Sequence, residues 1–241
     1  MRQLQRLLGR LAILGLGPAS SLYLRVHRGY RFATPSSLPK TYRRLVDDDR
    51  PLLVCANHLT MIDSLLIHHA LGSMLGYAAR YRRLCWNVAA AENVQKTRLA
   101  RVLTYLGKTI AIDREGSPEH HDGVLHELET LLREREPVTL FPEGTRSRTG
   151  RIEVDQVRYG VGRLLQRLPE ARVLCVYLRA EQQQSHGFAP ARHDVIHFDY
   201  RVLEPKTEQA GLCGARDLAR QVIYTLKRME ESYFGARLEE N

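Results

Sequence analysis

Short, continuously apolar runs alternate along the chain with longer stretches whose apolar residues recur every three or four positions. The runs have the length of buried strands and lie at Leu52–Ala56, Val88–Ala91, Thr109–Ile112, Val138–Phe141 and Val173–Leu178, with a further candidate at Val195–Leu203. The stretches with helical spacing lie at Asp63–Leu75, Val94–Leu106, Val124–Glu136 and Val157–Leu168, with a closing amphipathic stretch from about Ala215 to Tyr233. Such alternation is typical of βαβ units. The pattern therefore predicts an α/β fold with a mostly parallel sheet flanked by helices.

The first segment has a different pattern, with leucines on one side of a predicted helix and arginines on the other. The leucines are Leu4, Leu7, Leu8, Leu11 and Leu14, and the arginines are Arg2, Arg6 and Arg10. An uncharged run follows from Leu11 to Leu24, but Gly15, Gly17 and Pro18 interrupt it. The run is shorter than the roughly 20 residues that span a bilayer, so the sequence predicts a helix–proline–helix anchor at the membrane interface. A secretory signal and a helix docked on the core stay open as alternatives.

A single domain with an N-terminal extension is expected: an amphipathic membrane-associating segment over residues 1–40 and an α/β domain over residues 41–241. The whole chain carries 36 basic and 27 acidic residues, a formal net charge of +9. Residues 1–50 contain ten basic and three acidic side chains, so most of this excess lies at one end. That asymmetry favours an anionic partner, which is the phosphate of a membrane surface or of nucleic acid. Cys55, Cys85, Cys175 and Cys213 are scattered, which argues against a disulfide framework or a zinc ribbon.

A histidine and an aspartate follow the first apolar run of the predicted sheet. His58 lies just after Leu52–Ala56, and Asp63 comes five residues later. A turn between them would bring the carboxylate to the imidazole, fix its tautomer and make His58 a general base for a substrate hydroxyl. Backbone N–H groups at the helix start beyond Thr60 would then lie near a developing oxyanion. A purely structural reading stays open, since Thr60 and Asp63 also have the spacing of a helix capping box.

Arginines follow two more of the apolar runs. Asp113-Arg114 comes after Thr109–Ile112, and the run ending at Phe141 continues as Pro142-Glu143-Gly144-Thr145-Arg146. Carboxyl ends of parallel strands meet at one edge of a sheet, so these residues are expected to form a cationic mouth beside His58. The guanidinium group suits phosphate because it can donate two hydrogen bonds at once, and a glycine permits close backbone approach. The alternative is a glycine turn with solvated arginines.

In this order and spacing the motifs resemble those of the 1-acylglycerol-3-phosphate acyltransferase (lysophosphatidate acyltransferase) family. Residues 58–63 match H-x-x-x-x-D, residues 110–114 look like the isoleucine-rich segment ending in arginine, and residues 141–146 match F-P-E-G-T-R. Residues 157–160 are similar to the F-K-x-G stretch, and the amphipathic front end is similar to membrane-binding helices of the family. The likeness extends loosely from about residue 50 to 205.

The resemblance implies a role for each matching residue. His58 would be the general base and Asp63 its partner, while the acceptor and its phosphate would be bound by Arg114, Glu143, Gly144, Thr145, Arg146 and Arg158. The acyl group would come from acyl-CoA or acyl-carrier protein as co-substrate, with no metal and no other cofactor. The acceptor would be a lysophospholipid, most simply 1-acylglycerol 3-phosphate giving phosphatidate. We expect a peripheral or monotopic protein at the cytoplasmic face of a membrane.

One departure from the family pattern leaves the acceptor open. The last motif of the family has a proline in an apolar strand, whereas residues 173–177 here contain none and Cys175 lies near that place. A relative that acylates another lysolipid, an amino-lipid or a pigment-like lipid is therefore the alternative. A zinc enzyme is disfavoured because the histidine pairs at residues 68–69 and 120–121 lack the spacing of helical metal ligands. A nucleic-acid binder is disfavoured because the basic front end has few aromatic residues to stack on bases.

Overall fold

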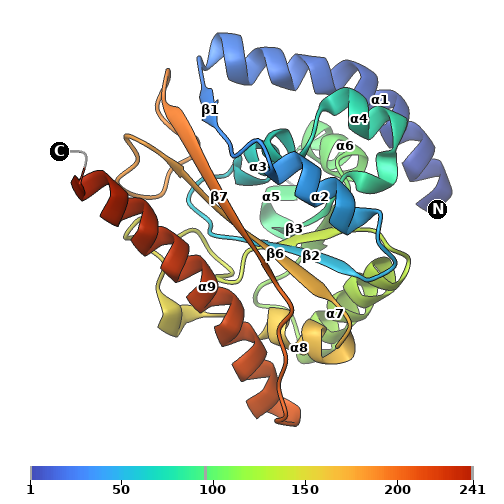
Figure 1. The fold of residues 1–241 in the computed structure, drawn as a ribbon. Coiled ribbons are helices and arrows are strands. Elements are labelled where there is room, and N and C mark those ends of the chain that lie inside the picture. Colours follow the sequence, from blue (N-terminus) through green and yellow to red (C-terminus); the bar gives the residue numbers. More distant parts are fainter. Residues whose placement is uncertain (1, 95–96, 240–241) are drawn as a thin grey trace.

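A mixed sheet forms the centre of the computed structural model, which describes residues 2–94 and 97–239 (Figure 1). Within these residues the sheet has seven strands in the order β1-β7-β6-β2-β5-β3-β4. Their bounds are β1 Arg31–Ala33, β2 Leu52–Ala56, β3 Trp86–Ala90, β4 Thr109–Ile112, β5 Val138–Leu140, β6 Arg172–Ala180 and β7 Val195–Leu203. The strands from β6 to β4 are mutually parallel, and β7 pairs antiparallel with β6. The predicted α/β class with a mostly parallel sheet is confirmed.

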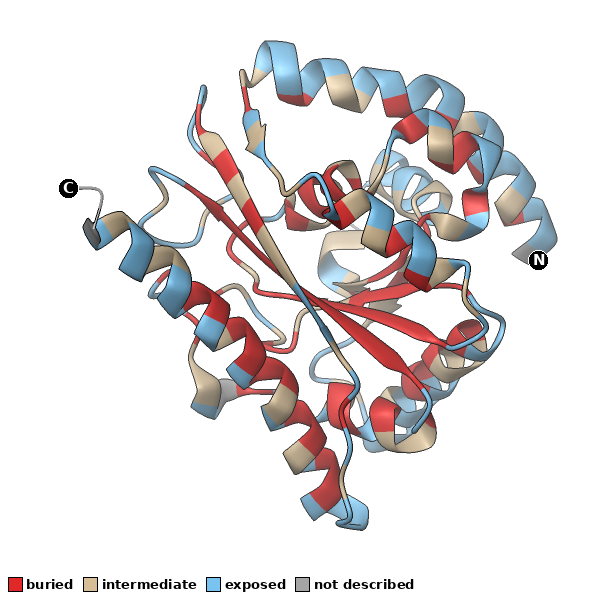
Figure 2. Cartoon of the chain, in the orientation of Figure 1, coloured by how far each residue is buried: buried red, intermediate tan, exposed pale blue. Residues whose placement is uncertain are grey.

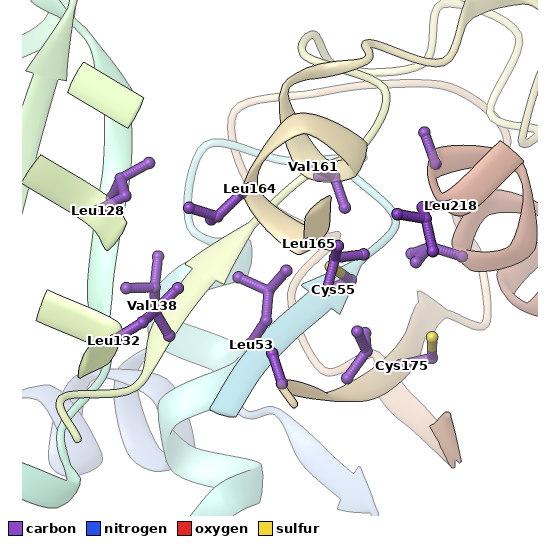
Figure 3. Close-up of a cluster of buried hydrophobic side chains, with 14 of the residues drawn as sticks. Leu53, Cys55, Leu128, Leu132, Val138, Val161, Leu164, Leu165, Cys175 and Leu218 are labelled. Carbon is purple, nitrogen blue, oxygen red and sulfur yellow. The ribbon is translucent and has the colours of Figure 1, made fainter. Parts of the chain in front are cut away.

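Helices cover both faces of the sheet, and the side chains of β2 alternate between them. Leu53 and Cys55 pack under α7 (Pro118–Arg133), α8 (Gly160–Arg167) and α9 (Gly211–Glu239), in the cluster drawn in Figure 3. Leu52 and Val54 face the opposite layer, which contains α1 (Arg2–Leu22), α2 (Leu38–Val46), α3 (Asp63–Leu71) and α4 (Met74–Ala79). Figure 2 shows the central strands buried throughout. Burial on both faces explains why these strands read as continuous apolar runs rather than alternating ones.

Most predicted strands agree with the structure, and the helices differ more. The runs predicted at residues 52–56, 109–112 and 195–203 match β2, β4 and β7 in full, whereas the three-residue edge strand β1 was not predicted. The helix predicted at Asp63–Leu75 is two helices, because α3 ends at Leu71, before Gly72, and Ser73 caps α4 by accepting a hydrogen bond from Gly76 N at 3.0 Å. The helix predicted at Val124–Glu136 is α7, which starts six residues earlier, at Pro118, and ends at Arg133.

The stretch predicted as a helix at Val94–Leu106 lies partly outside the described residues. Around residues 95–96 the structure has α5 (Ala91–Val94) and α6 (Arg98–Leu106). No side chain of α6 is buried, and Leu99, Val102 and Leu103 are exposed on it. The apolar side of α6 therefore faces outward.

The N-terminal helix runs through the glycines and the proline that were expected to break it. It continues from α1 into a π-helical turn, η1 (Tyr23–His27), and Pro18 lies inside α1. The hydroxyl of Ser21 donates to the Gly17 carbonyl at 3.1 Å within this part of the helix. Glycine serves close packing here, since a Cβ at Gly9 or Gly17 would lie 2.0 Å from Tyr81 or 2.7 Å from Met74.

The leucine side of α1 faces outward and its polar side faces the body of the protein. The leucines predicted to share one side are 41–59% exposed, and Figure 2 shows the outer surface of α1 exposed along much of its length. Gln5 is buried and donates to Tyr105 O at 2.7 Å, and Arg10 Nε donates to Ala78 O at 2.8 Å. By length and composition alone the helix from Gln3 to His27 could cross a membrane, a test that signal sequences and core helices also pass. The sequence had predicted no such helix, because its uncharged run is short.

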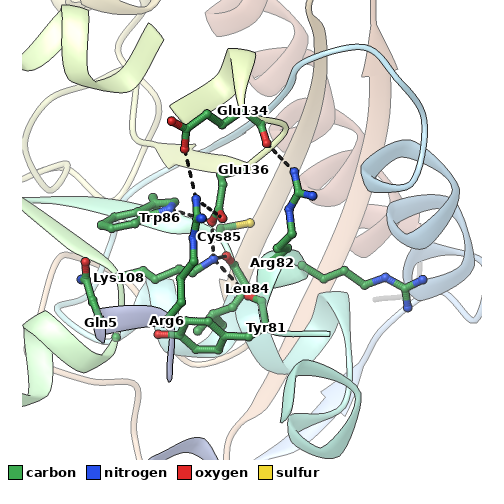
Figure 4. A network of polar contacts seen from close by, with 12 residues as sticks. Gln5, Arg6, Tyr81, Arg82, Leu84, Cys85, Trp86, Lys108, Glu134 and Glu136 are labelled. Carbon is green, nitrogen blue, oxygen red and sulfur yellow. Dashed lines mark hydrogen bonds and ion pairs between the residues drawn. The ribbon is translucent and has the colours of Figure 1, made fainter. Parts of the chain in front are cut away.

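A buried ion pair ties α1 to the amino-terminal ends of the strands (Figure 4). Lys108 Nζ lies 2.5 Å from Glu136 Oε2, and both side chains are fully buried. Lys108 also donates to the carbonyls of Tyr81 and Leu84, and Arg6 of α1 lies 3.0 Å from Glu136 Oε1. Burial lowers the pKa of Lys108, and the Glu136 carboxylate opposes that shift. The N-terminal helix is therefore held by buried polar contacts as well as by packing.

Candidate active site

The His58–Asp63 pair lies in the turn that links β2 to α3. His58 Nδ1 and Asp63 Oδ2 are 3.0 Å apart. The same Asp63 oxygen accepts hydrogen bonds from Leu59 N at 2.6 Å and Thr60 N at 2.8 Å, and Oδ1 accepts from the Thr60 hydroxyl at 2.5 Å. Asp63 is buried, whereas the His58 side chain is 16% exposed. One carboxylate therefore closes the turn and orients the imidazole, so the capping and the orienting functions coincide.

Two neighbours hold the His58 ring and its turn in place. The imidazole stacks on Phe141, with ring centroids 4.1 Å apart and planes inclined by 19°. Asn57 extends the β2–β6 pairing beyond the strand end, because its side-chain amide bonds to both the N–H and the carbonyl of Leu178 at 2.9 Å. With Nδ1 directed to Asp63, the other ring nitrogen, Nε2, is the one that could take up a proton from a hydroxyl. Sequence reasoning assigned no function to Asn57, whose partner lies on a strand 121 positions away.

Glu143 binds the backbone of the turn at His58. Its Oε1 accepts a hydrogen bond from His58 N at 2.9 Å, and Ser147 N donates to His58 O at 2.9 Å. These two bonds join residues 141–147 to the turn at His58. Burial raises the pKa of Glu143 to about 8, although the His58 N–H opposes the shift. Glu143 is thus mostly protonated near neutral pH. Within the described residues its carboxyl forms no ion pair with an arginine.

Gly144 brings Arg158 to the same loop. Gly144 has a φ of +69°, and a Cβ there would lie 2.6 Å from Arg158 Cγ. Arg158 N donates to Pro142 O at 2.8 Å, and its side chain is exposed. Thr145 is exposed beside it. A glycine is required both by the backbone conformation and by this close approach.

Arg146 contacts the loop between β6 and β7 rather than the other arginines. Its Nη1 donates to Gly187 O at 2.9 Å. Gly187 N in turn donates to Leu59 O at 3.0 Å, and Met61 N donates to Phe188 O at 3.1 Å. Residues 181–194 therefore form a wall of the site that sequence reasoning did not find. Met61 N is one of the backbone amides that were expected near an oxyanion. Because it already donates its hydrogen bond to the Phe188 carbonyl, it is not free to do so.

Arg114 lies at the same edge of the sheet but apart from the other candidate residues. It follows β4, and β5 and β3 separate that strand from β2. Three strand spacings correspond to about 14 Å. Among the described residues Arg114 is exposed and makes no hydrogen bond or ion pair. The structure therefore brings His58, Asp63, Glu143, Gly144 and Arg158 together, while Arg146 extends to the adjoining wall and Arg114 lies farther along the edge.

Cys175, which occupies the place of the expected proline, is not part of this site. It pairs in register with Cys55 and packs in the buried cluster of Figure 3. Burial raises the pKa of its thiol to about 12. Within residues 2–94 and 97–239 no group of three or more histidine, cysteine, aspartate or glutamate side chains could hold a metal ion.

The fold is α/β, and the turn at the carboxyl end of β2 holds a hydrogen-bonded histidine–aspartate pair. The chain belongs to the acyltransferase family, because the sequence model of that family matches residues 32–179, which is more than half of the chain. It is therefore an acyltransferase, as the motifs at residues 58–63 and 141–146 predicted. A similar solved structure is that of the 1-acyl-sn-glycerophosphate (LPA) acyltransferase PlsC from Thermotoga maritima. The two share 15% sequence identity over 93% of this chain and 97% of that one, with a TM-score of 0.49. No curated protein matches the chain.

Proposed function

We propose that the protein transfers a fatty acyl group from acyl-CoA or acyl-carrier protein to the free hydroxyl of 1-acylglycerol 3-phosphate, giving phosphatidate. The reaction takes place at the cytoplasmic face of a membrane, to which the protein binds as a peripheral or monotopic protein through the outward leucines of α1. The observation that carries the proposal is the 3.0 Å contact between His58 Nδ1 and the buried Asp63 carboxylate at the carboxyl end of β2.

In the proposed reaction His58 Nε2 removes the proton of the acceptor hydroxyl, and the oxygen attacks the thioester carbonyl. The new C–O bond forms and the C–S bond breaks, and the imidazolium returns the proton to the departing thiolate. Asp63 stabilises the imidazolium, because its carboxylate lies on Nδ1. No protein nucleophile is needed, since the acceptor supplies the hydroxyl, and the donor thioester is a co-substrate rather than a bound cofactor.

The acceptor phosphate binds to arginines on either side of His58. Arg158 supports this assignment because its exposed side chain lies against Gly144, in the loop that is bonded to His58. Arg146 belongs to the same loop and extends to Gly187, and Arg114 lies at the far end of the edge. A phosphomonoester is the acceptor group that best uses several guanidinium groups.

A thioester-release assay on detergent-solubilised protein tests the proposal, with each donor and with 1-acylglycerol 3-phosphate. We expect phosphatidate as the product and a loss of about 10²- to 10⁴-fold in kcat for His58→Ala, the range for removal of a general base. His126→Ala is the matched control, because His126 is exposed on α7 and should keep full activity. A folded His58→Ala variant with full turnover would refute the base. No turnover of this acceptor, with turnover of another lysolipid, would refute the acceptor alone.

A further inference from the structure

A groove rich in arginine opens beside α1, away from the candidate active site. It has a volume of about 660 Å³. Its cationic lining comes from α1, from the 3-10 turn η2 (Tyr81–Arg83) and the residue before it, and from the turn after α7, and consists of Arg6, Arg10, Arg80, Arg82, Arg83 and Arg135. A second hollow of about 540 Å³ shares Asp47, Arg80 and Arg83 with the first and adds Lys40, Arg43 and Arg44. The two hollows form one surface, called here the arginine groove.

Acidic side chains neutralise only part of the arginine groove. Asp47 pairs with Arg83 and lies 3.5 Å from Arg80, and Arg6 lies 3.1 Å from Glu134. Arg135 pairs with Asp49 at 2.5 Å. In the described part of the chain, Arg10 bonds only to backbone carbonyls, and the cationic groups of Lys40, Arg43 and Arg44 have no acidic partner. The arginine groove therefore keeps a positive charge that an anion would compensate.

The arginine groove and His58 lie at opposite ends of the sheet. Its residues precede strands: Asp47 comes before β2, Arg83 before β3 and Arg135 before β5. His58, in contrast, follows the carboxyl end of β2. Because these strands are parallel, the two sites are separated by the length of the sheet. The arginine groove therefore cannot be the place where the acceptor phosphate lies during transfer.

The apolar surroundings indicate which kind of anion fits. Leu7 lines the arginine groove, is 57% exposed, and belongs to the outward row of leucines on α1. A ligand in the groove would thus have cationic groups on one side and an exposed apolar row next to them. An anion with attached hydrocarbon chains satisfies both surfaces at once. Tyr81, the aromatic residue of the lining, is buried, so it offers no open ring face for a nucleotide base.

We propose that the arginine groove binds the headgroup phosphate of an anionic phospholipid in the bilayer, with its acyl chains along the leucine row of α1. The inference rests on the proposed membrane-surface location. It adds a lipid site that takes no part in acyl transfer and that selects anionic membranes.

Vesicle flotation tests the proposal with Arg43→Glu/Arg80→Glu, since both side chains are exposed and lie outside the buried network. The matched control is Arg163→Glu/Arg220→Glu, which makes the same charge change on exposed residues of α8 and α9 at the opposite face. The vesicles are phosphatidylcholine alone, or equimolar phosphatidylcholine and phosphatidylglycerol. We expect the groove variant to lose about tenfold or more of its partitioning onto the mixed vesicles, because each cation near an anionic surface contributes about 1 kcal/mol. The control should change by about twofold or less, since its charges lie away from the bilayer.

Four results would overturn the proposal. Equal losses in the two variants would mean that diffuse charge, not the arginine groove, attracts the membrane. Displacement from mixed vesicles by inorganic phosphate at matched ionic strength would assign the groove to a free anion. Unchanged vesicle binding with a raised KM for acyl-carrier protein would assign it to the donor. Wild-type protein that binds neither vesicle but forms phosphatidate in detergent would refute the lipid site and leave the acyl-transfer proposal intact; vesicle binding without turnover would do the reverse.

Discussion

Asp63 stabilises two things at the scale of a single residue, the turn after β2 and the orientation of His58. Asp63→Asn removes the charge that would stabilise an imidazolium and presents an amide to backbone donors. We expect kcat to fall about 10²- to 10⁴-fold and the free energy of unfolding to fall by about 1–3 kcal/mol. Steady-state kinetics and urea unfolding measure the two effects.

Thr60→Val is the matched control for that substitution. It removes the hydroxyl that donates to Asp63 Oδ1 but keeps the bond between Asp63 Oδ2 and His58. Stability should fall by about 1 kcal/mol, with kcat close to that of the wild type. A loss of kcat in Thr60→Val as large as in Asp63→Asn would contradict the separate action of Asp63 on the imidazole.

The raised pKa of Glu143 predicts a pH-dependent effect of Glu143→Gln. In the unfolded chain the carboxyl ionises near pH 4.5, whereas in the folded protein it ionises near pH 8. Between these values the folded state holds a proton that the unfolded state has lost, so this group destabilises the protein progressively as pH rises. Glutamine cannot ionise and its carbonyl can still accept from His58 N. The melting temperature of Glu143→Gln should equal that of the wild type near pH 4.5 and exceed it near pH 8. The same difference in melting temperature at the two pH values would contradict the raised pKa.

Sequence motifs predicted the reactive groups but not what holds them. His58 and Asp63 are five positions apart, so a turn after a strand is enough to bring them together. The bond from His58 N to Glu143 joins residues 85 positions apart, and the Arg146–Gly187 contact joins two loops from different strands. Such partners depend on how loops meet above the sheet, which the spacing of residues within one loop does not determine.

At the scale of elements, α1 offers a direct comparison between a glycine that packs and one that does not. A Cβ at Gly9 would lie 2.0 Å from the Tyr81 hydroxyl, whereas a Cβ at Gly15 would meet nothing within 4 Å. Gly9→Ala should therefore lower the free energy of unfolding by about 1–3 kcal/mol through overpacking. Gly15→Ala should raise it by up to about 1 kcal/mol, because alanine favours helix. Urea unfolding measures both free energies. Similar free energies for the two variants would contradict the packing of α1 against Tyr81.

The exposed apolar side of α6 predicts that truncating one of its leucines has only a small effect on stability. Leu99 is 67% exposed on α6, while Leu128 on α7 is 2% exposed. Leu99→Ala should change the free energy of unfolding by about 0.5 kcal/mol or less, and Leu128→Ala should lower it by about 2–5 kcal/mol. Thermal unfolding of the two variants and the wild type measures both effects. A large loss for Leu99→Ala would mean that α6 packs on the sheet after all.

Hydrophobic periodicity explains why the strands were predicted better than α6. The run at Leu52–Ala56 is buried on both faces, and few other structures accommodate five consecutive apolar residues. An amphipathic helix, by contrast, states only that one side is apolar. That side can meet a sheet, as in α7, or face outward, as in α1 and α6. Periodicity is the same in both cases, so only the tertiary arrangement distinguishes them.

At the scale of the whole molecule, the parallel sheet separates the two proposed functions. Strand ends that carry His58 and Glu143 lie at one edge, and the arginine groove lies at the other. α1 spans the layer between them (Figure 1). Its Arg6 and Arg10 line the groove. The alternation of strands and helices predicted the class of fold but not the strand order, and the groove depends on that order because it combines α1 with turns before β2, β3 and β5.

Separation by the length of the sheet predicts that the two sites act independently. Arg43→Glu/Arg80→Glu should leave kcat on micellar substrate within about twofold of wild type, because sites farther apart than roughly 10 Å without shared partners rarely couple. On vesicles containing phosphatidylglycerol its turnover should fall in proportion to the protein lost from the surface.

His58→Ala should bind those vesicles like the wild type while its kcat collapses. The triple variant should combine both losses multiplicatively. A groove variant whose kcat in micelles falls as far as its vesicle binding would show that the arginine groove belongs to the catalytic site.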